Sequence, residues 1–319
     1  MRLAKRHPEC EERGKVKKLY GVVAPIITPV KENGEIDYAS LKNLSLNLIE
    51  RGCDGLYVCG TTGGVAYFDK EERKRILETV WEAAKGKALV YAQTGGTILR
   101  DTLELTRHAL ELGVDGLGIL TPTYFKLRDE ELENYYTTVA KSVPADVPIY
   151  LYAIPDFAGN DLSLPLVTKL AEKCENIVGI KYSSGDYERI CRFKQIRDGK
   201  FSVLVSSPAV AHSAFSIGCD GIISGACILF TEEVKALYNA YRDGDMENVV
   251  RLQRDMYRWL AHSWPDEMAK CTAFAFHEGV ISTDAMRAPL MQLNREEKES
   301  FLKVMEEYKN NLSEGYGRV

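Results

Sequence analysis

Lys181 is the residue of this sequence whose surroundings most favour chemistry. It ends the apolar run NIVGIKYS, residues 176–183, so a single amine stands at the end of what reads as a buried strand. A desolvated lysine has a lowered pKa and keeps some neutral amine, which can attack a carbonyl carbon and form a Schiff base. The alternative is a lysine that extends past the strand to an ion pair at the rim, and position alone leaves both readings open.

A second candidate is Tyr152, which lies in the apolar run YLYAIP, residues 150–155. Its phenol can pass a proton to or from atoms that react at Lys181, provided that a threonine such as Thr61 holds it through a short hydrogen-bond chain. The alternative is a packed aromatic ring whose hydroxyl is satisfied elsewhere.

The stretch YVCGTTGG, residues 57–64, ends a third apolar run with two hydroxyls and three glycines. Glycine lets the backbone approach a ligand closely, and threonine offers both a hydroxyl and an N–H group. The stretch therefore predicts a seat for a small anion.

The elements that must position these residues follow a repeated pattern. The phrases GCDGLYV at 52, GVDGLGIL at 113 and GCDGIIS at 218 each follow an amphipathic stretch, so a glycine ends a helix, Asp-Gly turns the chain and a buried strand begins. Strict alternation of this kind predicts a (β/α)8 TIM barrel with a C-terminal helical appendage, in preference to an open doubly wound sheet. The strands are expected near 21–28, 54–59, 87–93, 115–120, 147–152, 177–181, 201–206 and 220–223.

Residues after about 243 show no further strand pattern and predict three helices, over 245–264, 265–280 and 294–312. We therefore expect three regions: an N-terminal extension at 1–19, the barrel at 20–243 and a helical region at 244–319. The first twenty residues are expected to be exposed to solvent. Trp259 and Trp264 in the helical region are expected to serve packing. The active site of such a barrel lies at the carboxyl ends of its strands, where the candidate residues gather.

Composition narrows the function. A net charge of −5 over 319 residues shows no basic excess for nucleic acid, and no apolar run is long enough to cross a membrane. Eight scattered cysteines without a C-x-x-C pair suggest reduced thiols in a cytoplasmic protein. The five histidines do not form H-E-x-x-H, and the glycine-rich turns are neither G-x-G-x-x-G nor a P-loop, so we expect no metal and no nucleotide cofactor.

Taken in order, several motifs resemble the dihydrodipicolinate synthase and N-acetylneuraminate lyase family of Schiff-base aldolases. They are GVVAPIITPVKENGEIDYASL, GTTGG, LTPTYF, YAIP, GIKYSSGD and GCDGIISG, spread over about residues 20–230. The resemblance implies a (β/α)8 barrel with a helical C-terminal region. It also implies a homotetramer built as a dimer of dimers.

By the same resemblance, Lys181 forms an imine with pyruvate or another 2-oxo acid, so the substrate itself becomes the electron sink and no cofactor is needed. Tyr152 matches the general acid/base. Thr62 and Tyr124 match the residues that complete its proton relay, with Tyr124 reaching in from a partner subunit.

The resemblance also implies the substrate-binding residues. Thr61 and Thr62 match the residues that hold the substrate carboxylate, where N–H groups and hydroxyls can replace an arginine. Ile223 lies where the family points a backbone carbonyl into the site.

Departures from the family pattern bear on specificity. Phe157 replaces the arginine that receives the second substrate's carboxylate in the synthases, and Gly64 replaces the glutamate after GTTG. In the sialic acid lyases a glycine and acidic residues bind the sugar tail. In this sequence Ser207 replaces the glycine, and Ala209 and Val210 occupy the positions of the acidic residues.

The function predicted is a lyase that makes or cleaves a C–C bond between pyruvate and an aldehyde, on a 2-oxo acid or 2-keto-3-deoxy sugar acid type of substrate. Phe157 favours an aldehyde half that is small, neutral or partly apolar. Three alternatives stay open: dihydrodipicolinate synthase chemistry on aspartate semialdehyde, hydro-lyase or deaminase chemistry on the same imine, and a non-catalytic barrel that binds a small carboxylate.

Overall fold

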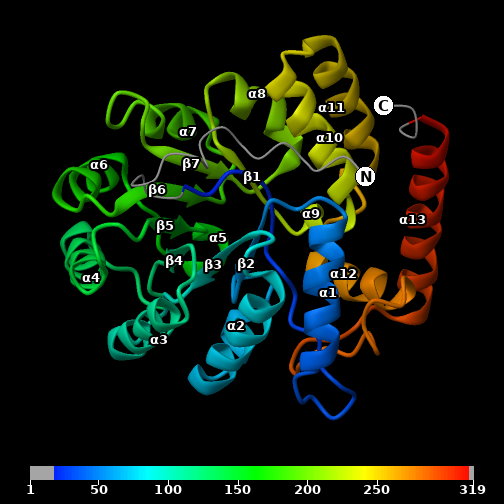
Figure 1. Cartoon of the computed structure of the whole chain (residues 1–319), viewed down its shortest axis with the longest axis horizontal. Coiled ribbons are helices and arrows are strands. Elements are labelled where there is room, and N and C mark those ends of the chain that lie inside the picture. Colours follow the sequence, from blue (N-terminus) through cyan, green and yellow to red (C-terminus); the bar gives the residue numbers. More distant parts are fainter. Residues whose placement is uncertain (1–17, 316–319) are drawn as a thin grey trace.

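The computed structural model describes residues 18–315 and contains a closed barrel of eight parallel strands surrounded by helices (Figure 1). Each strand pairs with the next along the chain, and β1 closes the barrel against β8. The predicted (β/α)8 barrel is therefore confirmed. The strands are β1 (Gly21–Ala24), β2 (Gly55–Val58), β3 (Leu89–Gln93), β4 (Gly116–Leu120), β5 (Ile149–Ala153), β6 (Ile177–Tyr182), β7 (Ser202–Val205) and β8 (Gly221–Ile223).

Helices alternate with the strands and continue beyond the last one. Local signals start several of them: Asp37 accepts from the N–H of Ser40, and Asp69 forms a reciprocal capping box with Glu72. The helices are α1 (Tyr38–Glu50), α2 (Lys70–Ala84), α3 (Leu99–Leu112), α4 (Asp129–Lys141), α5 (Pro155–Ala158), α6 (Leu164–Lys173), α7 (Tyr187–Phe193), α8 (Ala211–Ser216), α9 (Ala226–Leu229), α10 (Thr231–Asp243), α11 (Met246–Leu260), α12 (Glu267–His277) and α13 (Arg295–Gly315).

The inside of the barrel is filled largely by tyrosine rings. Tyr91 and Tyr150 pack edge to face with centroids 5.5 Å apart, and Tyr57 and Tyr152 do the same at 5.9 Å. All four side chains are buried. Such pairs add to the stability that burial alone provides, so this core is both apolar and geometrically specific.

Leu19 corrects the expectation of a solvated segment that ends at residue 19 or 20. Its side chain is fully buried among the barrel-lining residues, and its N–H donates to the Tyr150 hydroxyl at 3.0 Å. Strand β1 begins only two residues later, so an apolar residue at this point closes the amino end of the barrel. The rest of the expected extension, residues 1–17, lies outside the described residues.

The C-terminal helices lie against one side of the barrel, with α12 beside α9 and α13 (Figure 1). Trp259 packs edge-on against Tyr308 of α13, with ring centroids 5.5 Å apart, as expected of a packing residue. Within residues 18–315, no helix combines the length and apolar character needed to cross a membrane.

The seven cysteines of the described segment are free thiols, and all but Cys191 are buried. Burial raises the pKa of Cys53 and of Cys219 to about 12, so these thiols stay protonated at neutral pH. A protonated, buried thiol is a poor nucleophile, which leaves the chemistry to other groups. The eighth cysteine, Cys10, lies outside the described residues.

Candidate active site

Lys181 lies inside the barrel near the carboxyl end of β6. All six residues of this strand are buried, and Lys181 itself is only 4% exposed. Its Nζ lies 3.8 Å from the ring centroid of Tyr152 and 4.9 Å from that of Tyr57. The amine is therefore held between two aromatic faces and does not extend to the rim, which removes the alternative of a solvated ion pair for this residue.

The register of the barrel explains why Tyr152 faces Lys181. Strand β5 pairs with β6 so that Tyr152 lies directly opposite Lys181. The Tyr152 ring is fully buried, and its hydroxyl lies 2.9 Å from the hydroxyl of Thr61, with either group able to donate. A hydrogen-bonded phenol and hydroxyl, both able to donate and accept protons, thus lie beside the amine.

Thr61, and not Thr62, is the threonine that contacts Tyr152. The residue-based expectation named Thr61 for this contact, whereas the family resemblance assigned the relay to Thr62. Two consecutive residues of a tight turn point in different directions, so only one of them can reach the phenol. Both threonines are partly buried at the start of the turn that follows β2.

The turn itself is built to keep its N–H groups at the carboxyl end of the barrel. The N–H of Gly64 closes the turn on the carbonyl of Thr61 at 2.9 Å, and the Thr28 hydroxyl donates to the carbonyl of Gly63 at 2.9 Å. A Cβ on Gly63 would lie 2.8 Å from the backbone oxygen of Ile26, so only glycine fits. Within residues 18–315, the N–H groups of both threonines remain without a protein acceptor, which suits an anion seat.

Tyr124 lies on the loop between β4 and α4 and, within residues 18–315, does not contact Tyr152. It is 88% exposed, has a φ of 82° and packs edge-on against Phe125. Asn160 fixes this loop: its amide donates to the carbonyls of Pro122 and Phe125, each at 2.8 Å. The loop therefore holds an outward-facing aromatic pair in a defined conformation.

The remaining predicted residues surround the barrel mouth. Ile223 ends β8, is buried and pairs with Val23 of β1. Ser207 follows β7, where its hydroxyl accepts from the N–H of Ala209 at 3.2 Å. Phe157 belongs to α5, just after β5, and is 62% exposed. The structure brings Lys181 into contact with Tyr152, and the Ile223 side chain packs among the residues that line the barrel. Ser207 and Phe157 lie beyond the ends of their strands.

Sequence reasoning missed two groups near the site. Trp264, expected to serve packing, is 61% exposed and meets Phe157 edge-on with ring centroids 6.4 Å apart. Glu267, at the start of α12, interacts electrostatically with Lys181. Both come from the C-terminal region, and the isolated sequence carries no motif that relates them to β6.

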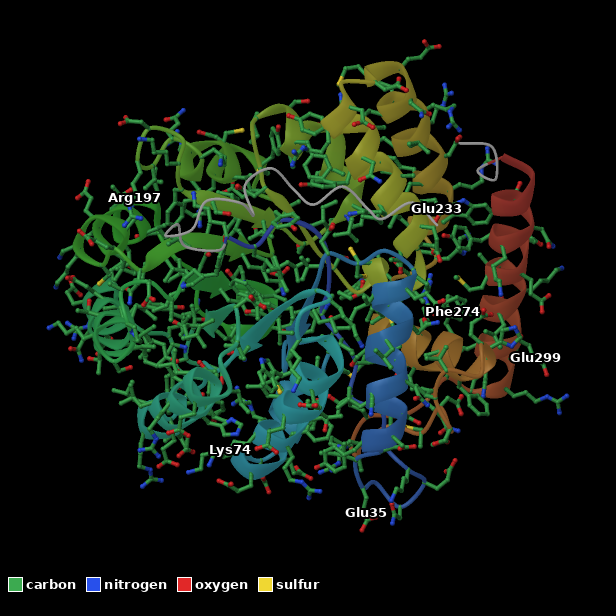
Figure 2. The ribbon with its side chains drawn as sticks, viewed as in Figure 1. Glu35, Lys74, Arg197, Glu233, Phe274 and Glu299 are labelled. Atoms are coloured by element: carbon green, nitrogen blue, oxygen red, sulfur yellow. The ribbon has the colours of Figure 1, made fainter. Side chains whose placement is uncertain are left out.

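A cavity of about 100 Å³ lies elsewhere, between α1, α10, α12 and α13. The Arg51 guanidinium on its wall is already bound to the Glu232 carboxylate at 2.7 and 2.8 Å, and it stacks over Phe274 (labelled in Figure 2) at 5.6 Å. This cavity is therefore part of the packing of the C-terminal helices, and none of its lining residues surrounds Lys181. Within residues 18–315, no group of three or more His, Cys, Asp or Glu side chains is placed to hold a metal ion.

A buried lysine near the carboxyl end of a barrel strand, with a phenol and a hydroxyl turn beside it, is typical of (β/α)8-barrel lyases that work through a Schiff base. The model of the dihydrodipicolinate synthetase family matches residues 18–308. The chain belongs to this family, which confirms the resemblance seen in the sequence. It is accordingly a Schiff-base-forming lyase of the pyruvate-dependent aldolase type.

Individual relatives agree over nearly the whole chain. The 4-hydroxy-tetrahydrodipicolinate synthase of Aquifex aeolicus is 32% identical over 291 residues, which are 90% of this chain and 97% of the relative. The crystal structure of dihydrodipicolinate synthase from the same organism superposes with a TM-score of 0.86 at 30% identity, covering 91% of this chain and 98% of that one. The E. coli prophage protein YagE, solved in complex with pyruvate, superposes with a TM-score of 0.85 at 27% identity and the same coverage.

Proposed function

We propose that Lys181 forms an imine with C2 of pyruvate or a related 2-oxo acid, and that the protein uses it to make or break a C–C bond to an uncharged aldehyde. One observation carries the proposal. The Lys181 amine lies 3.8 Å from the ring centroid of Tyr152, whose hydroxyl is 2.9 Å from Thr61. The amine is thus buried among groups that can hold and transfer protons, and the phenol ring lies beside the atoms that would be attached to it.

In the condensing direction, the neutral Lys181 amine attacks the carbonyl carbon of pyruvate, and loss of water from the carbinolamine leaves the imine. Loss of a proton from the methyl carbon gives the enamine, whose carbon attacks the aldehyde. Water then hydrolyses the new imine and frees the lysine. Tyr152 gives and takes the protons of these steps, and Thr61 relays them, because the two hydroxyls are in hydrogen-bond contact.

The carboxylate of the 2-oxo acid is proposed to bind in the turn after β2. The N–H groups and hydroxyls of Thr61 and Thr62 can donate to its oxygens without a cationic side chain. The Ile223 carbonyl at the end of β8 is the acceptor proposed for a substrate hydroxyl or N–H. The imine is covalent to the protein, so neither a metal nor a nucleotide is needed for this chemistry.

Tyr124 is proposed to complete the relay across a subunit interface of a homotetramer arranged as a dimer of dimers. Its 88% exposure and the rigid loop that Asn160 anchors support a contact with a second copy. The free thiols of the chain are in keeping with a cytoplasmic location.

Phe157 favours an uncharged aldehyde half, because a phenyl ring cannot neutralise a second carboxylate. The second candidate is condensation of pyruvate with aspartate semialdehyde, which the names of the 32% identical relatives favour. Efficient turnover of this anionic aldehyde would reverse the order of the two candidates.

The decisive experiment is incubation with pyruvate and borohydride, followed by peptide mass spectrometry. We expect a reduced pyruvate adduct on Lys181 that is absent from Lys181→Ala and retained in Lys173→Ala, which alters an exposed lysine of α6. Absence of an adduct from the native protein would refute the imine and support a non-catalytic carboxylate-binding barrel. Screening 2-oxo acids for pyruvate release then separates aldol cleavage from hydro-lyase or deaminase chemistry.

A further inference from the structure

Glu267, the first residue of α12, has its carboxylate fixed at the carboxyl end of β8. The carboxylate accepts hydrogen bonds from the N–H groups of Gly225 and Ala226, which follow this strand. A Cβ on Gly225 would lie 2.2 Å from Oε2 of Glu267, so the side chain rests directly on the glycine backbone. The absence of a side chain at residue 225 therefore makes room for this carboxylate.

The start of α12 also reaches the anion seat. Sδ of Met268 lies 4.0 Å from the position that a Cβ on Gly64 would occupy. The segment carrying Glu267 thus spans from β8 to the turn after β2, on the end of the barrel where Lys181 lies.

Charge couples the two residues. Burial raises the pKa of the Glu267 carboxyl, while attraction to Lys181 and the two backbone N–H donors oppose that rise. The carboxyl group, held at the carboxyl end of β8, therefore interacts with the amine at which the imine nitrogen forms. In its ionised form the carboxylate favours a positive charge at that position and disfavours a second negative charge near it.

An apolar wall stands beside this carboxylate. Trp264 precedes Glu267 by three residues and meets Phe157, which follows β5, edge-on with ring centroids 6.4 Å apart. Both rings are more than 60% exposed in the described chain, at 61% and 62%. Two open aromatic faces beside the mouth provide a surface on which an apolar or aromatic group can pack.

We propose that Glu267 and the Phe157–Trp264 pair are the specificity-determining residues for the aldehyde half, selecting an apolar or aromatic uncharged aldehyde and rejecting an anionic one. The inference rests on the proposed function and adds the class of its second substrate. The carboxylate repels an anionic aldehyde, and the aromatic pair binds the side chain of an apolar one. Selection of the aldehyde thus comes from the segment that follows β5 and from the start of the C-terminal region, and not from the strands that carry Lys181 and Tyr152.

The test compares kcat/KM for pyruvate condensation with benzaldehyde and with glyoxylate, an anionic aldehyde. In Glu267→Gln, whose amide oxygen can still accept from both N–H groups, we expect the benzaldehyde-to-glyoxylate ratio to fall about tenfold or more, the effect of removing a like charge several ångströms away. Asp266→Asn removes the same charge one residue earlier, on an exposed side chain, and should leave the ratio unchanged. Trp264→Ala should lower kcat/KM for benzaldehyde and leave that for glyoxylate unchanged.

A ratio in Glu267→Gln within about twofold of the native value, or an equal change in Asp266→Asn, would overturn the role of Glu267. Unchanged benzaldehyde kinetics in Trp264→Ala would overturn the apolar wall, and this exposed residue can be replaced without disturbing the core. Borohydride trapping with pyruvate is run on every variant. Loss of the adduct from the native protein refutes the imine, whereas a normal adduct with unaltered selectivity refutes only the present inference.

Discussion

Glu233 is a buried carboxyl group, remote from Lys181, whose protonation should make the stability of the protein depend on pH. It lies on α10, where Figure 2 labels it, and is only 2% exposed. Its Oε2 has no hydrogen-bond partner. Burial, with a smaller contribution from Glu232, raises the pKa of this carboxyl from its ordinary value of 4.5 to about 8, although a backbone hydrogen bond and Arg51 lower it in part. The folded protein therefore holds a proton on Glu233 that the unfolded chain releases.

The sign and size of the effect on stability follow from linkage. Between pH 4.5 and about pH 8 the folded state binds more protons at Glu233 than the unfolded state, so the free energy of unfolding falls as the pH rises through this window. The full difference in pKa corresponds to a loss of about 5 kcal/mol in the free energy of unfolding, which is complete above pH 8. Between pH 6 and pH 9 the expected loss is about 3 kcal/mol.

Glu233→Gln should remove this pH dependence. Its amide is also buried without a partner, which costs about 1–3 kcal/mol at every pH, so the informative quantity is the change in the difference between variant and native protein. Urea unfolding is followed by fluorescence at several pH values. From pH 6 to pH 9, the free energy of unfolding of the variant should rise by about 3 kcal/mol relative to that of the native protein. Glu247→Gln, on an exposed position of α11, is the matched control and should show no such gain.

A difference in unfolding free energy that is the same at pH 6 and pH 9 would refute the reasoning, because it would mean that Glu233 ionises normally in the folded state. A gain of equal size in Glu247→Gln would refute it as well. In that case the effect would come from overall charge and not from burial.

Tyr152→Phe should still form an imine on Lys181 that borohydride traps, but kcat should fall by about two to four orders of magnitude, because the variant keeps the ring and loses the proton donor. Full turnover in this variant would contradict the role of Tyr152 as the acid/base. Thr61→Val should both lower kcat and raise KM for pyruvate, because its hydroxyl contacts the Tyr152 hydroxyl and also serves the carboxylate seat. Thr62→Val should raise this KM and leave kcat nearly unchanged. Steady-state kinetics distinguish the two variants, and identical profiles would count against the assignment. Phe157→Arg should raise kcat/KM for anionic aldehydes by about tenfold by supplying a countercharge, and an unchanged aldehyde profile would remove Phe157 from the specificity argument.

Local patterns made much of this fold predictable. The eight expected strands overlap the eight observed ones, because a buried parallel strand needs a short apolar run and a helix needs a capping residue and a closing glycine. The start of α3 was less predictable, because this helix begins at Leu99 without a side-chain cap. Leu19 was misread for a similar reason, because a single apolar residue after a charged stretch carries no periodic signal.

The sequence by itself determined that Lys181 and Tyr152 end neighbouring strands of a barrel, because alternation and strand order are properties of the chain. Tertiary structure decided between Thr61, which the residues suggested as the partner of Tyr152, and Thr62, which the resemblance assigned to the relay, because the direction of each side chain depends on the closed turn after β2. It also decided that Glu267 from α12 faces Lys181. Contacts between segments so far apart follow from how the C-terminal helices pack on the finished barrel, and no local spacing encodes that packing.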